Sequence, residues 1–333
     1  MLKTSYEIVQ TEKKYLDDLI ELFIGNYKKI RENNPLLPIK YGIYEGIKPS
    51  ISWMLNNCNG VVALKDGKVV GYMSALILNQ FKSSNRGAYT PEFAHSSTEV
   101  DKVRIYNMMR TELWKLLASL ECTVHSITLL DDEALKTDFF MASYGLLVMD
   151  AMNTVDQLIA TTADHLSDKY SARIAKADEI EGIKPLVLSY RDYMSGPPIF
   201  NNLGAEDIDV MLERWFMEEK RSVWVVESQT GTHPEIIGFA NLITDPDNAS
   251  YVVRDKSVLG ISGTFILSEH RNRGAGSVLY NTASNWAKQN GYDKISVDFE
   301  SANPLALKFW LNHFEPVTYS LIRHIDDRLI GKV

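Results

Sequence analysis

The sequence predicts an α/β (α+β) protein of two tandem domains, and three observations lead to this prediction. The chain has 333 residues, enough for two domains that each bury a core. Its halves resemble each other with a period of about 165 residues, which indicates an internal repeat. Within the second half, residues 261–280 present an apolar strand, a glycine turn and a helix in immediate succession.

The elements of the first half follow one another as strand, helix, hairpin, helix, strand, helix and strand. Asp66-Gly67 between two apolar runs is a strong signal for a two-residue hairpin turn. The expected ranges are a strand at 6–9, a helix at 12–27, a hairpin at 60–72, a helix at 106–117, a strand at 125–129, a helix from 138 that closes at Gly145, and a strand at 148–155.

The second half repeats this order with a longer hairpin loop. A polar and small stretch at 158–168 predicts the junction, so the expected domains are residues 1–160 and 168–333. The expected ranges are a strand at 171–174, a helix at 179–193, hairpin strands at 222–226 and 236–240, a helix at 277–289, a strand at 294–300, and a helix that opens at Asn303-Pro304.

The glycine turn of the second half has the chemistry of a pyrophosphate cradle. Gly274 and Gly276 let the backbone approach a ligand and adopt positive φ, and the N–H groups at a helix start favour an anion. Arg271 and Arg273 add positive charge. The spacing fits neither a Walker loop, which needs Gly-Lys-Ser/Thr, nor a dinucleotide fingerprint, which needs a third glycine and a later acid.

The pattern Arg271-x-x-Gly274-x-Gly276 after an apolar strand resembles the Gln/Arg-x-x-Gly-x-Gly/Ala loop of the GNAT superfamily of N-acetyltransferases. The order of loop, helix, strand and Asn303 helix matches that family over 261–314. The resemblance implies two GNAT-like domains, each a mixed, mostly antiparallel sheet flanked by helices, and acetyl-coenzyme A as co-substrate. It implies cofactor contacts from Thr264, Phe265, Ile266, Arg271, Asn272, Arg273, Gly274, Ala275, Gly276, Ser277 and Asn303.

The first half lacks this loop. At the corresponding place, residues 98–103 contain no glycine and include Glu99 and Asp101, which would repel a pyrophosphate. The N-terminal copy is therefore expected to be a degenerate GNAT-like domain without coenzyme. Whether it serves as a scaffold or forms a wall of the acceptor pocket stays open.

Acetyl transfer to an amine needs an oxyanion donor, a base and usually an acid. The resemblance implies that the backbone N–H of Ile266 is the donor. Strand alternation at 294–300 places Asp298 and Glu300 on one face, where either carboxylate is a candidate base.

The general acid is the departure from the family pattern. The family usually has Tyr seven positions after the Asn, and this chain has Trp310 there. Three alternatives follow. Another group, Tyr280, Tyr319 or His313, replaces that acid; the thiolate leaves without a protein acid; or the domain binds coenzyme without turnover.

The leading interpretation is an N-acetyltransferase that acts on a primary amine of a small molecule or peptide. The alternative is a non-catalytic coenzyme A-binding or interaction module. Residues 190–202, rich in aromatic and turn-forming residues, lie where the family places variable acceptor loops, so they are expected to form part of the acceptor site or an ordinary connector.

Composition excludes several other classes of function. A net charge of -8 without a cluster of basic residues argues against nucleic acid as a main partner. The histidines are scattered without a metal-binding spacing, which predicts no metal site. The two cysteines fit a reducing compartment, and the expected location is the cytoplasm. The sequence shows no apolar run long enough for a membrane span and no signal-like N-terminus. The oligomeric state stays open.

Overall fold

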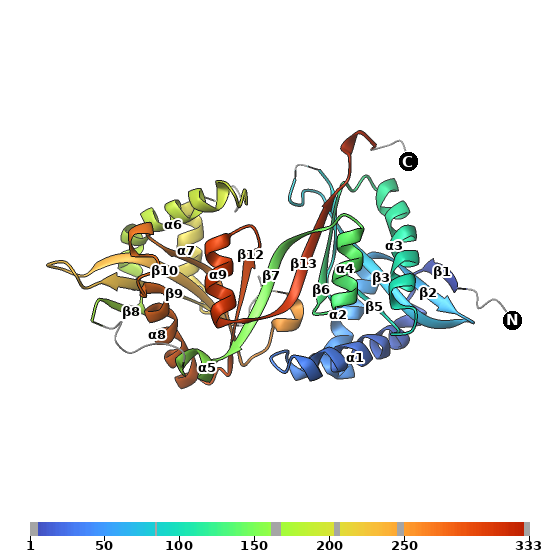
Figure 1. Cartoon of the computed structure of the whole chain (residues 1–333), viewed down its shortest axis with the longest axis horizontal. Coiled ribbons are helices and arrows are strands. Elements are labelled where there is room, and N and C mark those ends of the chain that lie inside the picture. Colours follow the sequence, from blue (N-terminus) through green and yellow to red (C-terminus); the bar gives the residue numbers. More distant parts are fainter. Residues whose placement is uncertain (1–5, 84, 161–167, 203–206, 245–249, 330–333) are drawn as a thin grey trace. The chain divides into compact units, whose positions relative to one another are not determined.

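The structure, a computed structural model, describes residues 6–83, 85–160, 168–202, 207–244 and 250–329. It contains two compact units (Figure 1). Unit 1 comprises Met1–Met149, Ser250–Val252 and Val317–Val333, and unit 2 comprises Asp150–Ala249 and Val253–Pro316. The predicted junction at 158–168 falls mostly outside the described residues.

Unit 1 has a mixed sheet in the order β1-β2-β3-β4-β6-β13, with β5 paired to β3. Its strands are β1 (Tyr6–Gln10), β2 (Asn59–Lys65), β3 (Lys68–Leu78), β4 (Gly87–Thr90), β5 (His95–Ser97), β6 (Val124–Leu130), the start of β7 (Gly145–Thr154), and β13 (Glu315–His324) from Val317 onward. Its helices are α1 (Leu16–Asn33), α2 (Tyr44–Asn57), α3 (Lys102–Ser119) and α4 (Glu133–Met141).

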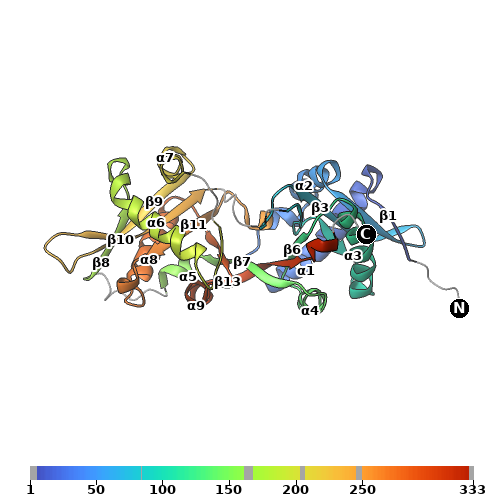
Figure 2. The same ribbon diagram turned by 90° about the horizontal axis from the view of Figure 1, so that it is seen from above.

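The last strand of the chain belongs to unit 1 rather than to unit 2. β13 pairs antiparallel with β6 from Thr318 opposite Leu130 to His324 opposite Val124. Leu321 of this strand is fully buried among the core side chains of α3, β6 and the β2–β3 hairpin. Figures 1 and 2 both show β13, in red, beside β6. A strand from the C-terminal end of the chain therefore completes the N-terminal core.

The predicted hairpin turn is present. β2 and β3 pair antiparallel, and both turn residues, Asp66 and Gly67, have positive φ (51° and 77°). These are the dihedral signs that a type I′ turn requires, and this turn twists in the same sense as the strands.

Unit 2 has the order β12-β11-β10-β9-β8, and the end of β7 lies next to β12. Its strands are β8 (Tyr170–Ile174), β9 (Arg221–Ser228), β10 (Glu235–Thr244), β11 (Val258–Ile266) and β12 (Lys294–Glu300). Its helices are α5 (Val155–Ala160), α6 (Ile180–Ser195), α7 (Ile208–Met217), α8 (Ala275–Gln289) and α9 (Pro304–His313).

Helices cover both faces of the unit 2 sheet. Val223 and Val225 of β9 point to one face, where they pack with Phe239 and with the apolar stripes of α6 and α7. Trp224 lies on the opposite face and contacts Trp286 of α8, with ring centroids 5.8 Å apart. This alternation follows from the two-residue period of a strand. The predicted strand 294–300 coincides with β12, and the predicted helix 277–289 is α8 with two more residues at its start.

Candidate active site

The site of unit 2 begins where β11 separates from β12. The parallel pairing of these strands runs only from Val258 opposite Lys294 to Ile261 opposite Val297. At the next residue a bulge in the β10–β11 ladder leaves Ser262 without a register partner. Because a bulge bends and twists its strand, the remainder of β11 diverges from β12.

At the end of β11, which is still paired with β10, the backbone N–H of Ile266 points away from that strand. Ile266 stands opposite Gly238, and the N–H of Leu267 donates to Ile237 O at 2.9 Å. In an antiparallel ladder this makes Ile266 part of a non-hydrogen-bonded pair, whose N–H and C=O point away from the partner strand. The N–H of Ile266 is thus directed to the side from which β12 has diverged.

The predicted cradle forms a tight turn into α8. Gly274 is the N-cap of α8 with φ of 96°, a conformation that favours glycine. Gly276 does not share it, contrary to the expectation that both glycines have positive φ, because it is the second residue of α8. Its requirement is space: a Cβ there would lie 3.3 Å from the Phe309 ring.

A pocket of about 440 Å³ opens between the turn, the end of β11 and α9. The predicted cofactor residues that line it are Thr264, Phe265, Ile266, Arg271, Asn272, Gly274, Gly276, Ser277 and Asn303. Arg273 is exposed and Ala275 is buried, and neither lines the pocket. The lining residues include His270, Arg271, Lys308 and His313 but no carboxylate. The pocket therefore suits an anionic ligand.

Asn303 joins α9 to α6. Its side-chain oxygen accepts the N–H of Ala306 at 3.2 Å, which caps α9, and the hydroxyl of Tyr193 at 2.8 Å. Its NH₂ group makes no hydrogen bond to the described part of the chain, although Asn303 is only 7% exposed. The amide is thus a donor at the pocket wall.

The side chain of Arg271 folds back along the pocket. Its Nε donates to Ile266 O at 2.7 Å, and its guanidinium carbon lies 4.9 Å from the ring centroid of Tyr193 and 5.1 Å from that of Phe265. The guanidinium is therefore held beside two aromatic rings at the end of β11.

Trp310 is 5% exposed and packs edge-on against Tyr280, with ring centroids 5.0 Å apart. The hydroxyls of Tyr280 and Thr264 are hydrogen-bonded to each other. Burial raises the pKa of Tyr280, and burial lowers the pKa of His313. Both residues line the pocket, whereas Tyr319 belongs to unit 1.

Asp298 and Glu300 are half-buried at the end of β12, and neither lines the pocket. Asn201, in the segment after α6, donates to Glu300 Oε1 at 2.5 Å. Burial, followed by the charges of Asp298 and Glu300, raises the pKa of Tyr190. The two carboxylates therefore face α6 and the predicted acceptor segment 190–202.

One group of lining residues was not predicted from the sequence. It is the part of α9 formed by Leu305, Ala306 and Phe309. Phe309 follows the other two by four and three positions, a spacing typical of one helical face.

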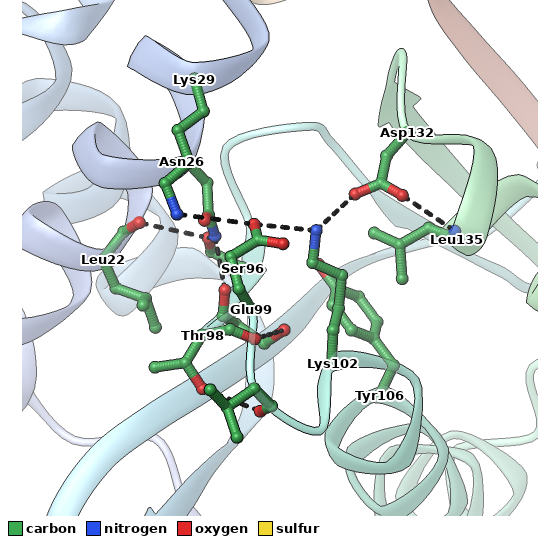
Figure 3. Close-up of polar contacts among 12 residues, drawn as sticks. Leu22, Asn26, Lys29, Ser96, Thr98, Glu99, Lys102, Tyr106, Asp132 and Leu135 are labelled. Atoms are coloured by element: carbon green, nitrogen blue, oxygen red, sulfur yellow. Dashed lines mark hydrogen bonds and ion pairs between the residues drawn. The ribbon is translucent and has the colours of Figure 1, made fainter.

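At the corresponding place in unit 1, charged side chains form ion pairs around the start of α3 (Figure 3). Lys102 Nζ, in the first turn of α3, lies 3.0 Å from Glu99 Oε1 and 2.7 Å from Asp132 Oδ2. The α3 N-cap is Asp101, where α8 has Gly274. Three acids, Glu99, Asp101 and Asp132, thus lie around the ion-paired Lys102 at the start of α3.

Within the described ranges, no group of three or more His, Cys, Asp or Glu side chains is arranged to hold a metal ion. None of the helices in those ranges is both long enough and apolar enough to cross a membrane.

Comparisons with known proteins agree with this geometry. Residues 189–314 match the model of the acetyltransferase (GNAT) family, and no curated protein sequence matches the chain. A GCN5-related N-acetyltransferase from Sphaerobacter thermophilus is similar in structure, with a TM-score of 0.59, 10% identity, and coverage of 96% of this chain and 95% of the other.

Two further solved structures are similar. A tandem GNAT protein from the clavulanic acid biosynthesis pathway has a TM-score of 0.52 and 12% identity, with 96% of this chain and 98% of the other covered. The GCN5-related glucosamine N-acetyltransferase region of a fungal multi-domain GH3 β-N-acetylglucosaminidase has a TM-score of 0.57 and 13% identity. That match covers 97% of this chain, which spans 38% of the fungal one.

At these identities the likeness concerns the fold alone. It confirms the predicted fold class, a mixed α/β architecture with mostly antiparallel sheets flanked by helices. The segment 189–314, which contains the splayed strands, the glycine turn and the Asn303 helix, is thus the part of the chain that matches the acetyltransferase (GNAT) family.

Proposed function

We propose that unit 2 transfers an acetyl group from acetyl-coenzyme A to a primary amine of a small molecule or peptide. The observation that carries the proposal is the pocket of about 440 Å³, whose lining combines a glycine turn, a helix N-terminus and several basic side chains without a carboxylate. Acetyl-coenzyme A, when bound, supplies the thioester that is the acetyl donor.

The residues present fit this coenzyme. The first N–H groups of α8 have no partner within the helix, so they are available to a diphosphate. Gly276 keeps the cradle open because a side chain there would enter the space beside Phe309. Asn303 offers its amide NH₂ to the pantetheine arm.

Three groups of the chain would serve as oxyanion donor, base and acid. We assign the N–H of Ile266 as the donor to the acyl oxygen, because it points to the side where the strands diverge. Asp298 or Glu300 is the base that takes the proton of the amine, directly or through water. Tyr280 lines the pocket beside Trp310, so its hydroxyl is our choice of acid among the substitutes for the family tyrosine, although burial raises its pKa and makes its proton harder to donate.

A second candidate function is coenzyme binding without turnover. The observation in its favour is Trp310, which is buried at the position where the family usually has the acidic tyrosine. The two functions differ in one measurement, the release of coenzyme A thiol from acetyl-coenzyme A.

The test combines binding and turnover. Calorimetric titration with coenzyme A should show binding, and a panel of primary amines should release thiol faster than the background without an acceptor. Binding without any acceptor-dependent release favours the non-catalytic module, and absence of binding contradicts both. A cytoplasmic location is part of the same proposal.

A further inference from the structure

Arg271 lines the unit 2 pocket, but its guanidinium does not lie where a cation that binds a diphosphate is expected. A group that serves the diphosphate should lie at the N-terminus of α8, where the N–H groups of the cradle converge. The Arg271 guanidinium instead lies beside Phe265 and Tyr193, and its Nε is anchored to Ile266 O. This is the end of β11, where the reacting thioester is expected.

The guanidinium lies on the face of the sheet that α6 covers. Tyr193 belongs to α6, and Phe265 packs into the core between the sheet and that helix. The predicted acceptor segment continues directly from this helix. Arg271 therefore links the coenzyme turn to the acceptor side of the site.

The Arg271 guanidinium interacts electrostatically with the exposed carboxylate of Glu269, two residues earlier, but is not ion-paired to it. Within the described residues Arg271 forms no ion pair, and none of the residues lining its pocket is acidic. Anchoring through Nε leaves the two terminal nitrogens for a ligand. A planar guanidinium with two nitrogens on one edge is suited to a carboxylate, which it binds through two parallel hydrogen bonds.

Three aromatic rings, those of Tyr193, Phe265 and Tyr190, lie between the Arg271 guanidinium and two carboxylates. The rings of Tyr193 and Tyr190 both contact Phe265, with centroid distances of 6.3 Å and 6.2 Å. Tyr190 in turn lies within the electrostatic influence of Asp298 and Glu300. A cation and a pair of carboxylates thus flank three aromatic rings.

We propose that Arg271 is a specificity-determining residue that binds a carboxylate of the acetyl acceptor, so that the acceptor is an amino acid whose amine lies near its carboxylate. The carboxylate pairs with the guanidinium, and the ammonium group is drawn toward Asp298 and Glu300. The inference rests on the proposed function, because it names the acceptor class of the same site.

The test compares each standard L-amino acid with its own α-carboxamide as acceptor. The amide has a less basic amine that is more often unprotonated, so chemistry alone favours the amide. Wild-type protein should nevertheless prefer at least one acid over its amide by about 10- to 100-fold in kcat/KM, the range expected for a charge-assisted bidentate contact. Calorimetry with the same pair in the presence of coenzyme A should show the same preference in Kd.

Arg271→Gln is the decisive variant, since glutamine is the other residue that the family loop accepts at this position. The acid-to-amide preference should fall by about 10-fold or more, through KM rather than kcat, while coenzyme A still binds. Arg271→Lys keeps the positive charge but loses the planar pair of N–H donors, so it should retain part of the preference. Lys308→Gln removes another positive charge from the same pocket lining and should leave the preference as it is.

Three results would overturn the inference. One is equal use of acids and amides, or of neither, by a wild-type protein that binds coenzyme A. The second is a preference that survives Arg271→Gln. The third is an Arg271→Gln variant whose main loss is coenzyme A affinity, which would assign the guanidinium to the diphosphate. A wild-type protein that does not bind coenzyme A contradicts the proposed function itself, and the inference with it.

Discussion

At the scale of single residues, the two glycines of the turn into α8 have different physical roles. Gly274 is needed for its left-handed backbone, and replacing it with alanine would cost about 1 kcal/mol in strain. Gly276 is helical, so alanine is tolerated by its backbone and opposed only by the nearby Phe309 ring. The two glycines of the motif are thus required for different reasons, one for its backbone conformation and the other for space.

Gly276→Asp should abolish coenzyme binding without unfolding the protein. The variant adds a side chain and a negative charge where the diphosphate is expected to approach the backbone, and an acid near a helix N-terminus does not destabilise the helix. Calorimetry with coenzyme A, together with a thermal melt, measures both effects. Gly276→Ala is the control for volume alone. Wild-type affinity in a folded Gly276→Asp protein would remove the cradle from the site.

Replacing the proposed base should slow turnover by about 10²-fold and leave coenzyme binding little changed. Asp298→Asn and Glu300→Gln test the two carboxylates separately. The residual rate should still rise with pH, as more of the amine loses its proton. Full activity in the double variant would leave deprotonation to solvent.

At the scale of elements, α9 depends on one side chain for both its start and its expected contact with coenzyme. The oxygen of Asn303 caps the helix and holds Tyr193, and the NH₂ group remains for a ligand. A single sequence position therefore combines a stabilising role with a binding role. The two roles use different atoms and are separable.

Asn303→Asp should separate them. Aspartate keeps an oxygen that caps α9, so the melting temperature should stay near that of the wild type, but it replaces a donor with a negative charge and should weaken coenzyme binding. Asn303→Ala should lower both, with a stability loss of about 1 kcal/mol from the missing cap. Equal coenzyme affinity in the aspartate variant would show that the amide does not contact the coenzyme.

β5 of unit 1 carries a buried histidine that makes this unit sensitive to acid. His95 Nε2 lies 2.9 Å from Thr128 O and Nδ1 lies 2.7 Å from the Tyr106 hydroxyl. These contacts fit a neutral ring that donates through Nε2 and accepts through Nδ1. Burial lowers the pKa of His95 to about 4, below the ordinary 6.5.

Unit 1 should therefore lose stability as the pH falls from 6.5 to about 4. In that window the unfolded chain binds a proton that the folded chain excludes, so the lowered pKa of His95 destabilises the folded state by up to about 3 kcal/mol at pH 4. Hydrogen exchange of β6 amides across this range measures the effect. His95→Gln should reduce the pH dependence but not remove it, because burial also lowers the pKa of His125 in β6 to about 4, and His233→Gln, in an exposed turn of unit 2, is the control. An unchanged slope in His95→Gln would contradict the assignment.

At the scale of the whole molecule, the two units share a fold but differ at the place where a coenzyme would bind. Unit 2 has Gly274 and an acid-free pocket lining, whereas unit 1 has Asp101 and the Glu99–Lys102–Asp132 ion pairs. Burying a diphosphate beside the acids of unit 1 would cost electrostatic energy that no glycine turn offsets.

Titration with coenzyme A should accordingly saturate at one site per chain. Isothermal calorimetry gives the stoichiometry, and Gly276→Asp, which changes unit 2 only, should remove the binding signal altogether. Two equivalent sites, or one site that survives in the variant, would mean that unit 1 binds coenzyme in spite of its acids.

The sequence by itself determined the local parts of this protein. The hairpin at Asp66-Gly67, the strand 294–300 and the turn into α8 were predictable because each depends on near neighbours in the chain: a turn pair, a two-residue alternation, or a glycine before a helix. The family pattern added the fold class, since it combines several such local signals in a fixed order.

Only the tertiary structure decided which distant segments meet. No local signal places β13 in the core of unit 1, because its alternating pattern would suit either sheet, and the choice follows from the pairing with β6 and the burial of Leu321. For the same reason the sequence could not direct Arg271 toward Tyr193. That contact joins residues far apart in the chain, and a side chain with several rotatable bonds is oriented by its surroundings rather than by its place in a motif.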